Sequence, residues 1–287
     1  MTFYQWLDLF TLAGINGLFA LGLYIQMRTG QLSLASGAFL GVGAVTSVRL
    51  TQAGMPFELG ILSGGVVAAM IGIAVAYSCL RLQGLYLAVA TLAFTEIMRV
   101  LSTNISWLGG SLGLHDVHIR TTPWHVLIVV GLTMLWLHRH QRSVMGIRWD
   151  SLRTAEKAAT VVGIETRLHR LTAFAVGAAI LGLGGGLLVH YVGFLSPDSY
   201  GYQNGVAILL FVQLGGLGTA FYPLLAAMSI TSLLELLRPF AENRLLIYAL
   251  FLVVVTIIRT RRAEARAKPL VSRLSSTMKF FGKDIHK

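Results

Sequence analysis

Side chains that could do chemistry are sparse in this chain, and Glu96 lies deep within an apolar stretch, LAVATLAFTEIMRV. A charge at membrane depth is costly, and it usually faces a cavity or a partner. Glu96 is therefore a candidate contact for a transported solute or a gate. The alternative is an ion pair with Arg99, three residues later, which is favoured if this helix ends near Leu101.

The motifs of common catalytic sites are missing from the sequence. It contains no G-x-x-x-x-G-K-[ST] phosphate loop, no H-E-x-x-H and no G-x-S-x-G. His138 and His140 are two histidines without a third ligand nearby, which is a weak metal signal. The single cysteine, Cys79, allows no intramolecular disulfide. We therefore expect no catalytic residue, no metal site and no cofactor bound by this chain, which argues against an enzyme.

The composition indicates a membrane protein. Of 287 residues, 55% are hydrophobic and 12% are charged, whereas soluble domains carry roughly 25% charged residues. Most of the surface must therefore face lipid. The net charge of +11 is concentrated in segments 139–170 and 259–287. Such clustering is typical of cytoplasmic loops and argues against a nucleic-acid-binding surface.

The hydropathy pattern predicts an all-α, polytopic transmembrane helix bundle of about nine spans (8–10). A helix needs about 20 apolar residues to cross the bilayer. The candidate spans are 7–27, 32–50, 58–80, 84–101, 124–138, 168–190, 203–219, 221–237 and 244–260. With the basic 139–167 loop inside, the N-terminus lies outside and the C-terminus lies in the cytoplasm.

Two stretches of small residues predict close packing of the spans. Ala175, Ala179, Gly182 and Gly186 recur at helical spacing, so one helix face is nearly bare backbone. In GQLSLASGAFLGVGAVTS, residues 30–47, hydroxyls and glycines dominate half of the segment. We expect this span to be tightly packed or to line a polar path, with backbone that can be partly unwound.

The segment SLRTAEKAATVVGI, residues 151–164, predicts a short amphipathic helix. Asp150 or Ser151 can cap its start, and Gly163 can end it. The helix would have about three turns, too few to cross the bilayer or to be stable alone in water. It therefore needs a surface to dock on. From the residues alone, a partner protein and the membrane surface both remain open.

The same segment and its neighbours resemble the membrane permeases of branched-chain amino acid ABC importers. That family has E-x-A-A followed by Gly-Ile in its cytoplasmic loop, and the matching residues here are Glu156, Ala158, Ala159, Gly163 and Ile164. Further similar stretches, in the family's order, are GQLSLASGAFLGVGAVT, YLAVATLAFTEIMRV, GGSLGL, HYVGFLSPDSY and LGGLGT. The resemblance runs from about Gly14 to Arg259 and is closer to the M-type permease than to its H-type partner.

The resemblance implies a transmembrane permease domain at 1–262, with a cytoplasmic coupling loop at 139–167, and a basic cytoplasmic tail at 263–287. It implies four partners in a bacterial cytoplasmic (inner) membrane: an H-type permease subunit, two ABC ATPase subunits and a periplasmic or lipid-anchored binding protein. The ATPases would use ATP and Mg, and the residues of the E-x-A-A and Gly-Ile motifs would sit in a groove of the ATPase.

The resemblance also implies a pathway for a small solute, and we expect its lining to include Gln31, Ser33, Ser36, Thr91 and Glu96. Where the family has Gly-His after Ser-Leu, this chain has Ala-Ser. A branched-chain or other hydrophobic amino acid is the expected solute, and urea, short amides or other small organic solutes are the alternative. An autonomous secondary transporter or channel is less favoured, because such proteins carry more ionisable residues deep in their spans.

Overall fold

Helices are the regular elements of the part of the chain that the structure describes. In the computed structural model these residues are 3–79, 81–115, 117–237, 253 and 257. They contain no strand, and an isolated antiparallel bridge joins Leu114 to Leu195. The all-α prediction is therefore confirmed for the described residues.

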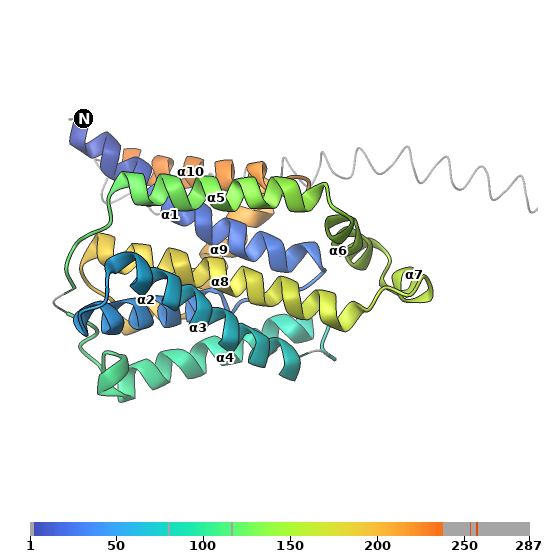
Figure 1. Ribbon diagram of the computed structural model, residues 1–287, viewed down its shortest axis with the longest axis horizontal. Helices are drawn as coiled ribbons and strands as arrows, with labels where there is room; N and C mark the ends of the chain where they lie inside the picture. The colour runs from blue at the N-terminus through green and yellow to red at the C-terminus, as the bar shows by residue number, and fades with distance from the viewer. Residues whose placement is uncertain (1–2, 80, 116, 238–252, 254–256, 258–287) are drawn as a thin grey trace, which may run out of the picture. The chain divides into compact units, whose positions relative to one another are not determined.

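The helices follow the predicted order along the chain (Figure 1). The α-helices are α1 (Phe3–Arg28), α2 (Ser36–Gln52), α3 (Phe57–Ser78), α4 (Leu85–Asn104), α5 (Pro123–Gln141), α6 (Val144–Thr154), α7 (Glu156–Val161), α8 (Thr166–Val192), α9 (Tyr202–Gly215) and α10 (Phe221–Leu236). Two 3₁₀ helices are η1 (Ser106–Leu108) and η2 (Pro197–Tyr200). Each predicted span up to 221–237 coincides with an α-helix, and 244–260 lies outside the described residues except for 253 and 257.

The chain divides into two compact units, Met1–Leu233 and Leu234–Lys287. Nearly all described residues belong to the first unit. The boundary predicted at 262–263 lies outside the described residues and stays a prediction.

Four of the described helices are long and apolar enough to cross a membrane, which indicates a polytopic membrane protein. They are Gln5–Arg28, Phe57–Ser78, Leu85–Asn104 and Thr166–Val192. The most apolar stretches of α1 and α8 are 78% and 72% buried, whereas those of α3 and α4 are 39% and 28% buried. α1 and α8 therefore form the core, and α3 and α4 present apolar faces outward, as a helix in lipid does.

Glycines bring α2, α3 and α8 into backbone contact. A Cβ atom at Gly43 would overlap the backbone of Gly182, and one at Gly64 would lie 2.5 Å from the Gly43 carbonyl oxygen. A Cβ at Gly185 would likewise overlap the Leu40 carbonyl. We call Gly43, Gly64, Gly182 and Gly185 the glycine seam. Gly182 belongs to the predicted small-residue stripe, so the predicted close packing of that face is confirmed.

Candidate functional site

The polar segment between α5 and α8 folds as two short helices, and the prediction of one helix over 151–164 is wrong. Ser143 caps α6, because its Oγ accepts a hydrogen bond of 3.3 Å from the Gly146 N–H. The two expected caps, Asp150 and Ser151, instead lie inside α6, and Asp150 pairs with Arg28. Ala155, with φ −153° and ψ 68°, separates α6 from α7. We call Val144 to Gly163 the α6–α7 segment.

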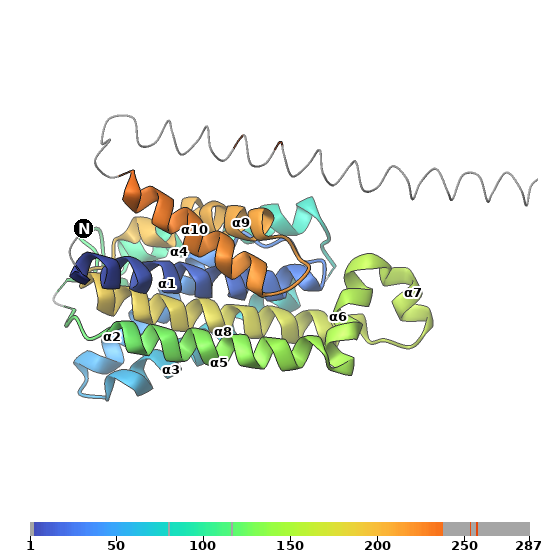
Figure 2. The ribbon, with the colours of Figure 1, turned by 90° about the horizontal axis from the view of Figure 1, so that it is seen from above.

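The predicted apolar face of this segment is split by the break. Leu152 and Ala159 are buried, whereas Ala155 and Val162 are exposed. Gly163, with φ +83°, ends α7 as predicted. The segment extends past the ends of α5 and α8 in both ribbon views (Figures 1 and 2).

The five residues of the family motif in α7 and the turn after it differ in their exposure. Ala158 and Gly163 are exposed, Ala159 is buried, and Glu156 and Ile164 are half-buried. The backbone N–H of Ile164 donates to the Ala159 carbonyl at 3.0 Å and closes the turn after α7. This turn therefore brings Gly163 and Ile164 next to Ala158 and Ala159.

The Glu156 carboxylate ties α7 to two other elements. Its Oε2 accepts from Arg170 Nη2 on α8 at 2.8 Å and from Gln83 Nε2, between α3 and α4, at 3.2 Å. The Arg170 carbonyl in turn accepts from Gln31 Nε2 at 2.8 Å. Glu156 therefore connects α7 with the bundle, and the predicted pathway residue Gln31 belongs to the same end of the molecule.

A second region of the site is the break between α1 and α2. Residues 29–35, which we call the junction segment, are not helical, so the expected helix start at residue 32 is four residues too early, because α2 begins at Ser36. Thr91 Oγ1 accepts from the Leu34 N–H at 2.9 Å, and Thr95 Oγ1 donates to the Leu34 carbonyl at 3.0 Å. These hydroxyls satisfy backbone groups that the break leaves without helical partners, as a buried backbone requires.

The two predicted pathway serines are fully buried at this break. Ser33 Oγ accepts from the Ala35 N–H at 3.2 Å. Ser36 is the first residue of α2, and its Oγ has no hydrogen-bond partner among the described residues. The structure thus brings Ser33, Ser36 and Thr91 together around the start of α2.

Helix α9 starts beside the start of α2. After α8, Gly193 turns the chain with φ +77°, and η2 leads to α9 inside the bundle. Tyr200 is 1% exposed and packs where Gly41 has no side chain. A Cβ on Gly37 would lie 2.6 Å from the Gly201 carbonyl oxygen, so the starts of α2 and α9 touch through backbone.

Glu96 lies between these helix starts and Arg99. Its Oε2 accepts from Arg99 Nε at 2.8 Å, and its Oε1 accepts from the Tyr202 N–H at the start of α9 at 3.3 Å. The ion pair considered from the sequence is therefore present. The same carboxylate also binds a free N–H of α9, a role that sequence spacing did not reveal.

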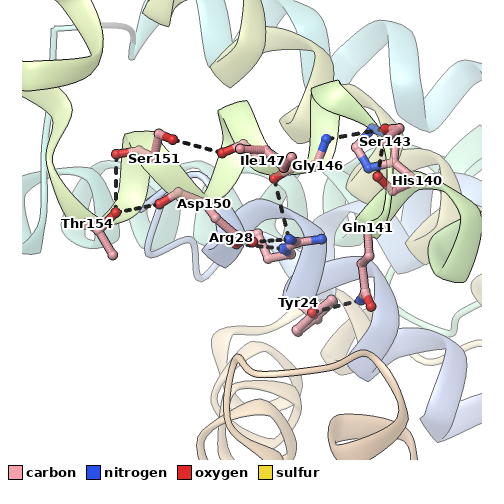
Figure 3. A network of polar contacts seen from close by, with 10 residues as sticks. All are labelled: Tyr24, Arg28, His140, Gln141, Ser143, Gly146, Ile147, Asp150, Ser151 and Thr154. Atoms are coloured by element: carbon pink, nitrogen blue, oxygen red, sulfur yellow. Dashed lines mark hydrogen bonds and ion pairs between the residues drawn. The ribbon is translucent and has the colours of Figure 1, made fainter.

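Arg28 and Asp150 form a further contact that the sequence did not predict (Figure 3). Arg28 ends α1, and its Nε donates to Asp150 Oδ1 at 2.9 Å. Its Nη2 contacts Asp150 Oδ2 and donates to the Gly146 carbonyl at 3.4 Å. Next to this pair, Gln141 Nε2 donates to the Tyr24 hydroxyl at 2.9 Å.

Of the two histidines near the end of α5, His140 is in an aromatic environment, whereas His138 is exposed. The His140 ring lies 4.9 Å from that of Trp136 and 4.2 Å from that of Trp149, centroid to centroid. Among the described residues, no group of three His, Cys, Asp or Glu side chains is placed to hold a metal ion. His140 therefore contributes to packing beside α6.

Comparison with known proteins gives a consistent set of relatives. Residues 5–258 match the family described as branched-chain amino acid transport system, permease component. The high-affinity branched-chain amino acid transport system permease protein LivM of Escherichia coli is 30% identical, over 91% of this chain and 70% of LivM. The autoinducer 2 import system permease LsrC of Salmonella typhimurium is 26% identical, over 80% of this chain and 70% of LsrC. The galactofuranose transporter permease YtfT of Escherichia coli is 23% identical, over 73% and 63%. No solved structure matches. This chain belongs to the family of permease components of branched-chain amino acid transport systems.

Proposed function

We propose that this chain forms half of the pathway of an ATP-driven importer for a small amino acid with a branched-chain or other hydrophobic side chain. The observation that carries the proposal is the α6–α7 segment. At the end of α7, Val161 and Val162 are 87% and 80% exposed. Adjacent exposed apolar side chains at the tip of a polar segment are suited to contact with a protein partner.

The proposed partners are an H-type permease subunit, two ABC ATPase subunits and a periplasmic or lipid-anchored binding protein. ATP and Mg are then used by the ATPases and not by this chain. The permease spans the bacterial cytoplasmic membrane about nine times, with its N-terminus outside and its C-terminus inside. The 139–167 loop, which holds the α6–α7 segment, faces the cytoplasm, and the excess of basic residues in this loop supports that orientation.

In this proposal, the ATPases drive the transport cycle through the α6–α7 segment. Closure of the ATPases on ATP can shift the permease only if it changes contacts that differ between two arrangements. Ala158 and Gly163 are small and exposed, so they allow a close approach of a groove, and Glu156 holds α7 against α8 and the α3–α4 connection.

The pathway is proposed to pass the paired starts of α2 and α9. Irregular backbone at membrane depth is tolerated where protein or a water-filled cavity covers it, and discontinuous helices often surround transport sites. Ser33, Ser36, Thr91 and Glu96 lie at this point, and Gln31 lies toward the α6–α7 end.

A second solute class is favoured by one observation. Ala35 and Ser36 stand where the resembled family has Gly-His, so the imidazole ring of the histidine is replaced by the small hydroxyl side chain of Ser36. Loss of the larger side chain suits a different small solute, such as urea or a short amide.

The proposal is tested with the complete importer. The permease, extracted with its partner subunits, is compared with a V161D/V162D variant, and the amount of co-purified ATPase is measured. We expect at least a tenfold loss of co-purified ATPase. In the proposed complex both valines are buried against the ATPase, and the variant would place a charge at each of these positions. Val192→Asp changes an exposed valine at the end of α8 and should keep the ATPase bound.

Transport then identifies the mechanism and the solute. In proteoliposomes, uptake of leucine should require ATP and the ATPases, and excess urea or acetamide should not compete with it. Uptake that persists without the ATPases would contradict the proposal and favour an autonomous transporter. If urea or acetamide, at a concentration similar to that of leucine, competes with leucine uptake, the second solute class is favoured.

A further inference from the structure

We propose that the Arg28–Asp150 pair is the joint that transmits movement of the α6–α7 segment to the junction segment of the pathway. Arg28 and Asp150 are then positioning residues, because they act on the pathway through the backbone that follows Arg28. The inference rests on the proposed function, since it assumes that the α6–α7 segment is moved by an ATPase.

The contact has the geometry of a fixed joint. Arg28 uses two of its nitrogen atoms on the two carboxylate oxygens of Asp150, and Nη2 also reaches the Gly146 carbonyl. A two-point guanidinium–carboxylate contact fixes orientation as well as distance. Because Gly146 and Asp150 lie one turn apart on α6, Arg28 holds both the position and the rotation of that helix (Figure 3).

The charge keeps the two helices together. The Arg28 side chain is 4% exposed and that of Asp150 is 43% exposed. A buried guanidinium without a counter-charge is strongly unfavourable. The three ion pairs of the described residues give Arg28 one carboxylate, that of Asp150. If α6 moves, α1 therefore has to follow at Arg28, or the pair has to break.

The joint is attached directly to the pathway. Arg28 is the last residue of α1, and the junction segment begins at the next residue. A Cβ on Gly30 would lie 3.7 Å from the Cα of Arg153, so the backbone of α6 passes within about one methyl group of the junction segment. The Arg28–Asp150 pair and this close approach thus place α6 at the same end of the segment.

The other end of the junction segment is anchored to a different helix. Leu34 is held by Thr91 and Thr95 of α4 through its N–H and its carbonyl. Seven residues therefore bridge α6 and α4, no helix stiffens them, and between the two ends Gln31 Nε2 also donates to the Arg170 carbonyl of α8 at 2.8 Å. A displacement of α6 changes the distance between the Arg28–Asp150 pair and the Leu34 contacts with α4. The backbone near Leu34, where Ser33 and Ser36 lie, then has to adjust.

The test is the number of solute molecules transported per ATP hydrolysed by the reconstituted importer. For Asp150→Asn we expect this ratio to fall at least fivefold while ATP hydrolysis stays within about twofold of the original chain. Asp150→Glu keeps the charge and should restore most of the ratio. Glu165→Gln is the control, because it removes a carboxylate from the same loop that lies outside the three ion pairs.

A merely structural role for the pair predicts a different pattern, in which transport and hydrolysis fall together and the ratio is unchanged. An unchanged ratio in Asp150→Asn would overturn the inference. If Asp150→Asn fails to assemble, the R28D/D150R exchange decides. A ratio near that of the original chain supports the joint, whereas assembly with a low ratio, or no assembly, overturns it. Failure of the original chain to transport with ATP would instead overturn the proposed function.

Discussion

The glycine seam and the α6–α7 segment are held in the fold by opposite kinds of contact. In the seam, the backbones of α2, α3 and α8 touch, and a Cβ atom at Gly43 or Gly185 would overlap backbone. The α6–α7 segment buries a few side chains, such as Trp149 and Leu152, but its end at Val161 and Val162 is exposed, and the ion pairs Arg28–Asp150 and Glu156–Arg170 attach it to the bundle.

This difference separates a rigid part of the permease from a part that can be moved. Backbone packing in lipid leaves no side chains to adjust, so we expect α2, α3 and α8 to move together as a unit. Ion pairs fix the direction of a contact at a few points, and they can transmit displacement without filling the space between helices. Each of the following substitutions changes either the glycine seam or the α6–α7 segment.

The largest effect is expected in the seam. Gly43→Leu forces a branched side chain into the backbone of α8, which should cost about 3 kcal/mol or more in stability. The measurement is the temperature at which the detergent-extracted permease loses its monodisperse elution peak. Gly131→Leu, on α5, is the matched control, because a Cβ there meets nothing within 4 Å. Equal losses of stability in both variants would show that the seam is no tighter than the exposed face of α5.

A smaller effect is expected from the ion pair of α7. Glu156→Gln removes the charge that faces Arg170, and partly exposed pairs contribute about 1 kcal/mol, which corresponds to about a fivefold loss of affinity for the ATPase. Arg170→Gln should cause the same loss, and the double variant should lose no more than either single one. Additive losses would show instead that Glu156 contacts the ATPase directly and independently of Arg170.

The smallest effect is expected at the end of α7. Gly163→Ala places a side chain at φ +83°, where space is open but the backbone conformation is unfavourable by about 1 kcal/mol. We expect a twofold to fivefold weaker binding of the ATPase in titrations. Gly54→Ala, with φ +92° and equally open space, carries the same backbone strain at the turn after α2 and should leave binding unchanged. Weakening by both variants would assign the effect to general stability.

The parts that could be predicted from sequence are those set by local composition. The apolar runs located the helices, and the spacing of Ala179, Gly182 and Gly186 identified the face of α8 that packs closely. The hydroxyl-rich stretch around Ser33 predicted close packing or a polar path and allowed for partly unwound backbone, because unwound backbone needs polar side chains to satisfy it.

The parts that could not be predicted depend on contacts between distant residues. Arg28 and Asp150 are 122 positions apart, and nothing in either local pattern indicates that they meet. The predicted cap was wrong for a related reason: the helix begins earlier, at the Ser143 cap, so Asp150 and Ser151 both lie in the interior of α6. Tyr200 likewise gave no signal, because its neighbour Gly41 is a residue without a side chain.

The turn at Gly193 has a consequence for how the protein is made. Residues 194–201 return into the bundle without forming an α-helix, and α9 has 14 residues, a length of about 21 Å against a hydrocarbon core of about 30 Å. Bare backbone of this kind is not stable in lipid until other protein covers it. Its cover, around Gly37 and Gly41 on α2, is synthesised first. The order of synthesis therefore suits this fold, because the residues that cover the segment are made before the segment itself.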